Sequence, residues 1–224
     1  MRIFQLIPKV TFLFLLTFSV RTLQAQAIEF SSDMRLFSGS GDVQIVKLYV
    51  GNKRALIQRD GSKGDVRGIG SIILDFDNQF IFLLIPQSRF YLRVTGSQGS
   101  PFYNAAWMFR PYNPTMPCEG WVAEADRRGI TVRCKTAGQE SINGKPVQRW
   151  DATATNGASG SLWYDPDLNF VVKVIRKSPG AIESGYELQN ISKETQPIAL
   201  FDTTKYREFT MPKLLDVLTG TGQW

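Results

Sequence analysis

The acidic side chains are the residues of this sequence whose types and spacing could support catalysis. Asp75 with Asp77, and Glu119 with Glu124, are pairs of carboxylates of the kind that serve as general acid and base. The 224 residues include no histidine, which excludes Ser-His-Asp and Cys-His catalysis and every metal site that uses imidazole. A turn explains the first pair and a solvated helix face explains the second. We therefore expect no catalytic residues and no enzymatic activity.

Three other motifs lack residues that their chemistry requires. The segment "DPDLNF" begins like a calcium-binding loop, but Phe170 occupies the position of the required glycine and Arg176 that of the bidentate glutamate. The glycines Gly64, Gly68 and Gly70 lead into a strand rather than the helix N-terminus that a phosphate-binding loop needs. The sequence has no Ser-x-x-Lys pattern. We expect neither a metal nor a cofactor.

The stretch "CKTAGQESINGKPVQRWDA" (134–152) combines a cysteine, a glutamate and a tryptophan, as an active site could. Its centre indicates a hairpin instead, because Asn143-Gly144 tolerates positive φ at both central positions of a type I′ turn. Pro146 removes one backbone donor, which places this arm near a sheet edge. The pattern favours two strands joined by a tight turn over an active site.

Residues 1–27 have the features of an export signal. Arg2 and Lys9 form a positive N-terminal region before an apolar run, "VTFLFLLTFSV", that is too short to span a bilayer, and "AQA" provides a small-residue cleavage site. An uncleaved anchor is the alternative, but Arg21 and the polar "TLQAQA" follow the apolar run closely. We expect a mature chain that begins at Ile28, lies in the periplasm rather than outside the cell, and has no membrane span.

The charge of the protein changes when this segment is removed. Three of the 26 lysines and arginines lie within 1–27 and none of the 20 acids does, which leaves 23 against 20 and a net charge of +3. No dense basic run remains, so we expect no binding to nucleic acid. The remaining 197 residues are enough for one sizeable core, and we predict a single domain over 28–224.

The chain contains two cysteines, Cys118 and Cys134. In an exported protein such a pair is most simply a disulfide, and the Cys-x-x-Cys spacing of a redox site is absent. We predict a structural bridge between them.

Short strands with turn signals between them predict an antiparallel, mainly β fold. A short amphipathic helix is expected over 119–129, ending at Gly129, and another over 213–218. The expected strands are 28–38, 43–50, 53–60, 71–76, 79–86, 89–95, 130–134, 160–165, 169–177, 185–192 and 207–212.

Two segments suggest an apolar cavity. In the strand at 80–85 both faces are apolar, with Phe80, Phe82 and Leu84 on one of them, so both faces need cover. That cover is a cavity or, equally well, a plain sandwich core. The segment 100–117 is rich in aromatic residues and proline, and it is either a lid over the cavity or a buried crossover. The candidate ligand-binding residues are Phe80, Phe82, Leu84, Phe102, Trp107, Met108 and Phe109.

The order of features resembles the LolA/LolB-like superfamily of periplasmic lipoprotein carriers, and more closely an allied family of exported bacterial domains of unknown function. The resemblance rests on "KLYVGNKRALIQ", "FIFLLIPQSRFYL", the cysteine pair, "GQESINGKPVQRW", "SLWYD", "ELQNI" and "LFDTTKYREFTMP". It implies a strongly curved antiparallel half-barrel whose concave face is covered by short helices and, in the carriers, holds acyl chains. A non-enzymatic protein that binds a lipid or another apolar ligand is the expected function. The alternative is an envelope scaffold that binds a partner protein and no small ligand.

Overall fold

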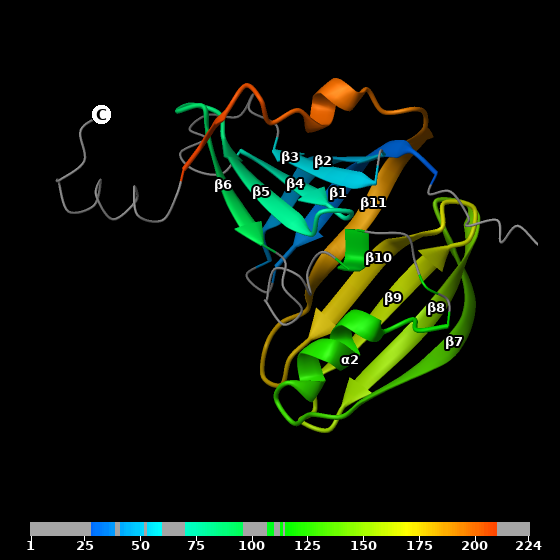
Figure 1. The fold of residues 1–224 in the computed structure, drawn as a ribbon. Coiled ribbons are helices and arrows are strands. Elements are labelled where there is room, and N and C mark those ends of the chain that lie inside the picture. The colour runs from blue at the N-terminus through cyan, green and yellow to red at the C-terminus, as the bar shows by residue number, and fades with distance from the viewer. Residues whose placement is uncertain are drawn as a thin grey trace, which may run out of the picture.

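The computed structural model describes residues 28–38, 41–51, 53–59, 70–95, 107–109, 113 and 115–209. Their twelve strands form a single open, curved sheet in the order β12-β6-β5-β4-β3-β2-β1-β11-β10-β9-β8-β7 (Figure 1). Neighbouring strands are antiparallel, except that the two-residue β12 runs parallel to β6. The predicted fold class, a curved antiparallel half-barrel with short helices, is confirmed.

The sheet consists of two meanders joined by the ladder between β1 and β11, which pairs Phe30 with Lys193 at one end and Phe37 with Gly185 at the other. The first meander contains β1 (Phe30–Phe37), β2 (Val43–Gly51), β3 (Arg54–Arg59), β4 (Ser71–Asp75), β5 (Phe80–Ile85) and β6 (Phe90–Thr95). The second contains β7 (Val132–Ile142), β8 (Lys145–Ala154), β9 (Ser159–Asp165), β10 (Phe170–Lys177) and β11 (Ser184–Lys193). The remaining elements are η1 (Trp107–Phe109), α2 (Glu119–Asp126), η2 (Ile198–Phe201) and β12 (Arg207–Glu208).

The stretch around Asn143-Gly144 is a hairpin, as predicted. Both residues have positive φ, 53° and 74°, and they connect β7 to β8. The Asn143 side chain also donates a hydrogen bond to the carbonyl oxygen of Leu188 at 3.0 Å. Leu188 lies in β11, which is three positions from β8 and four from β7 in the sheet order. The contact therefore shows how strongly the second meander curls.

Alternation along the strands gives the sheet two apolar faces. The inner face carries η1 and α2, and its core includes Met34, Leu48 and Leu162, none of them more than 1% exposed. On the outer face of the first meander, η2 covers a second, smaller core that contains Leu84 and Phe201. Adjacent residues of a strand point to opposite faces, so a continuously apolar strand such as β5 contributes to both cores.

The predicted disulfide between Cys118 and Cys134 is present, and the Cα atoms are 6.2 Å apart. It joins the residue before α2 to β7, so it holds the N-terminal end of the helix against the sheet. Glu119 in the first turn suits the positive end of the helix dipole. The helix is shorter than expected, because the chain leaves it after Asp126 in a turn that Gly129 completes with φ 67°.

Some predictions concern residues outside the described ranges. These are the export signal over 1–27, the helix over 213–218, and most of the segment 100–117, including Phe102. Among the described residues, no helix has the length and apolar character needed to cross a membrane.

Candidate functional site

A cavity of about 420 Å³ lies on the inner face, between α2 and the strands of the second meander. Figure 1 shows α2 against this part of the sheet. The cavity is lined by Gly120, Trp121, Glu124, Ala125, Arg128, Ile130, Val132, Ala152, Thr153, Ala154, Asn156, Ala158, Ser159, Gly160, Arg176, Lys177 and Ser178.

Small residues beneath α2 account for this space. The Trp121 ring lies directly over Gly160, where a Cβ atom would stand 2.9 Å from the ring. The neighbouring floor positions Ala152, Ala154 and Ala158 carry only methyl groups. The Trp121 ring therefore rests directly on the sheet at Gly160, and the floor beside that ring stays open.

The cavity has an apolar side and a basic side. Trp121, Ala125, Ile130 and Val132 provide the apolar wall together with the alanines of the floor. The basic side consists of Arg128 from the turn after α2, and of Arg176 and Lys177 from the end of β10. The arrangement suits a small molecule with an apolar body, since ligand sites combine apolar walls with a few polar groups.

The acidic residue of the cavity lining is already engaged. Glu124 accepts hydrogen bonds from both Arg127 and Arg128, the latter at 2.5 Å. Arg176, by contrast, lies at the exposed side of the cavity. Burial of its guanidinium lowers the pKa of Arg176, and electrostatic interactions with Tyr186 and Glu124 offset this only in part.

The structure divides the predicted site residues between the two faces of the sheet. Phe82 and Leu84 belong to the outer core under η2, and Phe80 points to the same face, where the Arg93 guanidinium lies 5.0 Å from its ring. Met108 and Phe109 are buried in the inner core. These five residues therefore do not share a cavity, and none of them lines the space beneath α2.

The segment around η1 is packed where the structure describes it. The Phe109 ring stacks on Tyr186 at 5.6 Å, and the Tyr186 hydroxyl donates hydrogen bonds to the carbonyl oxygens of Met108 and Val171. The Trp107 side chain lies outside the described part of the chain. The contacts of Met108 and Phe109 are those of a buried crossover.

The residues of β5 on the inner face are Ile81 and Leu83, which sequence reasoning did not select. With Ile57, Ile72 and Val94, Leu83 forms a half-buried apolar surface on the inner face of the first meander. The alternation of β5 was visible in the sequence. Which of its two apolar faces would meet the helices was not, because both are equally apolar.

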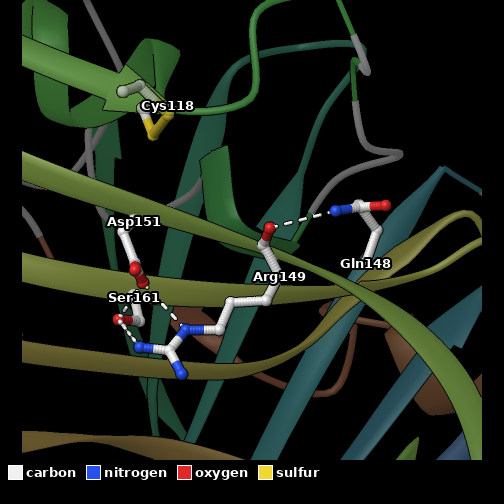
Figure 2. The surroundings of a disulfide bond; sticks show 6 residues. Cys118, Gln148, Arg149, Asp151 and Ser161 are labelled. Atoms are coloured by element: carbon white, nitrogen blue, oxygen red, sulfur yellow. Dashed lines mark hydrogen bonds and ion pairs between the residues drawn. A yellow bond between two sulfur atoms is a disulfide. The ribbon is translucent and has the colours of Figure 1, made fainter. Parts of the chain in front are cut away.

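A polar cluster occupies the outer face of the second meander. Arg149 donates a hydrogen bond to Asp151 at 2.8 Å, and the Ser161 hydroxyl donates one to the same carboxylate (Figure 2). Arg149 also donates to Glu140, whose other oxygen accepts from Trp163, and these bonds lower the pKa of Glu140. The charged groups of this cluster satisfy one another, so it ties β7, β8 and β9 together and leaves no open coordination site.

No group of three or more Asp, Glu or Cys side chains that could hold a metal occurs within the described ranges. The acid pairs considered at the outset have structural partners as well. Asp75 accepts hydrogen bonds from Arg54 and Asn78, and Asp77 pairs with Lys53.

No protein-family model matches the chain, and no curated protein matches its sequence. Its fold is similar to that of an uncharacterised conserved protein from Thermus thermophilus, at 6% identity and a TM-score of 0.50 over 82% of this chain and 90% of that one. MucB in the MucA/MucB complex from Pseudomonas aeruginosa matches at 10% identity and a TM-score of 0.48, over 82% of this chain and 58% of that one. A LolA superfamily protein from Nitrosomonas europaea matches at 10% identity and a TM-score of 0.32, over 79% of this chain and 90% of that one.

At these identities the likeness concerns the fold alone. The curved twelve-stranded sheet with helices on its inner face is the architecture that the resemblance to the LolA/LolB-like superfamily implies.

Proposed function

We propose that this chain is an exported, non-catalytic binding protein that holds a lipid or another apolar ligand beneath α2. The observation that carries the proposal is the 420 Å³ cavity, whose apolar side contains Trp121 and several alanines. Its size lies within the range of about 300–1,000 Å³ that is usual for small-molecule sites. The Cys118–Cys134 disulfide supports export, because such bonds persist in oxidising compartments.

The proposal places the ligand against the second meander rather than at the residues chosen from the sequence. Phe82 and Leu84 are covered by Phe201 of η2, so they have no free surface for a ligand comparable to that beneath α2. The half-buried surface around Leu83 and Ile72 is a further apolar area on the same inner face.

Native mass spectrometry with organic extraction tests the proposal first. Lipid that copurifies with the protein, or that it takes up when offered, is the expected result. The second test is calorimetric titration with decanol on the wild type and on Ala154→Leu, which fills part of the floor. Ala154→Leu is expected to weaken decanol binding, whereas Ala123→Leu, at an exposed position of α2 outside the cavity, leaves it unchanged.

A partner-binding role is the second candidate, and strand β7 favours it. In the described sheet β7 pairs with β8 alone, and residues 135–141 are exposed. An exposed edge strand can accept a strand from another protein. The register of the ladder shifts between Thr136 and Gly138, and this irregularity shortens the regular stretch of β7 with which a partner strand could pair. A protein that carries no lipid and does not bind decanol would favour this second role over the first.

A further inference from the structure

The charges around the cavity beneath α2 are unbalanced. Its lining contains three cationic side chains, Arg128, Arg176 and Lys177, and one acid, Glu124, which gives a local net charge of +2. On the other face of the same strands, Arg149 pairs with Glu140 and Asp151. The basic side of the cavity is therefore unlike the balanced polar surface on the other face of the same strands.

Arg176 faces the cavity from β10 without a direct partner. No hydrogen bond or ion pair of Arg176 occurs within the described ranges, and Glu124 is bonded to Arg127 and Arg128 in the turn after α2. The surrounding protein nevertheless desolvates its guanidinium enough to lower its pKa, although the side chain still reaches the solvent-exposed side of the cavity. The charge of Glu124 offsets this burial only in part. A partly desolvated charge without a directly bonded counter-ion is unfavourable, and a bound anion would relieve that cost.

The apolar wall and the cationic side belong to one space. Trp121 and Ala125 lie on α2, and Arg176 lies on β10, across the same cavity. A guanidinium binds carboxylate or phosphate through a planar pair of donors. Within this small space a ligand could contact the tryptophan ring and the guanidinium at once.

We infer that the ligand of this cavity is a compact amphiphile, with its apolar body against Trp121 and one carboxylate or phosphate group at Arg176. The inference rests on the proposed function and names the class of ligand that the same site selects. Neutral lipids of the same chain length would fill the apolar part and leave Arg176 without an anion. A free inorganic anion would meet Arg176 and gain nothing from the apolar wall.

Calorimetric titration of the protein with decanoate, decanol and inorganic phosphate tests this inference. Decanoate is expected to bind about tenfold more tightly than decanol, a difference of about 1.4 kcal/mol, and phosphate to bind far more weakly than either. Arg176→Gln is expected to reduce decanoate binding to the level of decanol and to leave decanol binding unchanged. Arg176→Lys keeps the charge and retains part of the preference. Added salt should narrow the gap between decanoate and decanol, because the site is open to solvent.

The matched control is Arg133→Gln, which removes the same charge from an exposed residue that does not line the cavity. It is expected to leave the preference for decanoate intact. Equal binding of decanoate and decanol to the wild type would overturn the inference and leave the proposed function standing. Binding of neither compound would overturn both. Phosphate binding as tight as that of decanoate would show a simple anion site and overturn the amphiphile.

Discussion

Two short helical segments cover this sheet, and they do so in opposite ways. On the outer face, η2 inserts Phe201, which is 1% exposed, among Leu56, Ile73 and Leu84. On the inner face, α2 rests with Trp121 on Gly160 and stands over alanines. The first contact is sealed by large side chains, and the second leaves an open cavity.

The difference shows that side-chain size beneath a covering segment separates structural packing from a binding site. Burying a phenylalanine stabilises a fold by roughly 1.5–3 kcal/mol. The glycine and alanines beneath α2 bury little apolar surface, so they contribute less stability and leave space instead. The disulfide at Cys118 compensates, because it holds α2 at one end without filling the floor.

The largest expected effect comes from opening the sealed contact. Phe201→Ala should lower the free energy of unfolding by about 3–5 kcal/mol, because it leaves a cavity among large apolar neighbours. Denaturant unfolding measures this loss. Decanol binding should not change, since Phe201 lies on the other face from α2. Leu200→Ala is the control. Because Leu200 is only half-buried in the same segment, this variant should lower the free energy of unfolding less than Phe201→Ala does. Equal losses for the two variants would contradict the sealed contact.

Removing the tether of α2 should have the next largest effect. The double variant Cys118→Ser, Cys134→Ser opens a loop whose ends are 16 residues apart. For a loop of this size the expected loss is about 3 kcal/mol. Thermal and denaturant unfolding measure it, and thiol titration of the wild type gives the control. Two reactive thiols in the native wild type would disprove the bridge.

A smaller effect is expected from raising the floor beneath Trp121. In Gly160→Ala the new methyl group would meet the ring at 2.9 Å, so the ring must move away from the sheet. Overpacking of this kind costs about 1–3 kcal/mol. The methyl group would also lie 3.0 Å from the carbonyl oxygen of Ile175, and that part of the cost remains in every background. In a Trp121→Leu background the part due to the ring should disappear, and a double-mutant cycle measures this coupling. A coupling of zero would show that the ring does not rest on Gly160.

The smallest effect concerns charge on the outer face near η2. Burial raises the pKa of Asp75, but hydrogen bonds from Asn78 and the charge of Arg54 outweigh it and hold the pKa below its ordinary value of 3.8. A carboxyl group with a lowered folded-state pKa stabilises the fold above its unfolded pKa, and that stability is lost as pH falls through the folded value. Asp75→Asn should therefore cost about 1–2 kcal/mol at neutral pH, and the difference from wild type should shrink below about pH 4.

Unfolding of both proteins across this pH range measures the effect. Asp77→Asn is the matched control, because the exposed pair of Asp77 with Lys53 should contribute almost nothing. A difference between wild type and Asp75→Asn that does not depend on pH would contradict the role of the charge.

The sequence predicted the architecture better than the site. Period-two alternation and Asn-Gly turns are local signals, so the strands, the hairpin at Asn143 and the bridge at Cys118 could be predicted. The cavity depends on how α2 lies against β9, which no local pattern encodes. From the sequence, Gly160 is only the first residue of an expected strand, and Arg176 is only a residue unsuited to calcium. Small residues within a strand that faces a helix were the available signal.

The ladder between β1 and β11 has a consequence for folding. The other long ladders join strands adjacent in sequence, whereas this one pairs Phe30 with Lys193. Contacts between residues so far apart in sequence form slowly, because bringing them together restricts the conformational entropy of the whole intervening chain. Each meander can form early, and β1 then remains an unpaired edge until β11 has been synthesised and arrives. Substitutions at this seam, such as Met34→Ala, should therefore accelerate unfolding more than they slow folding.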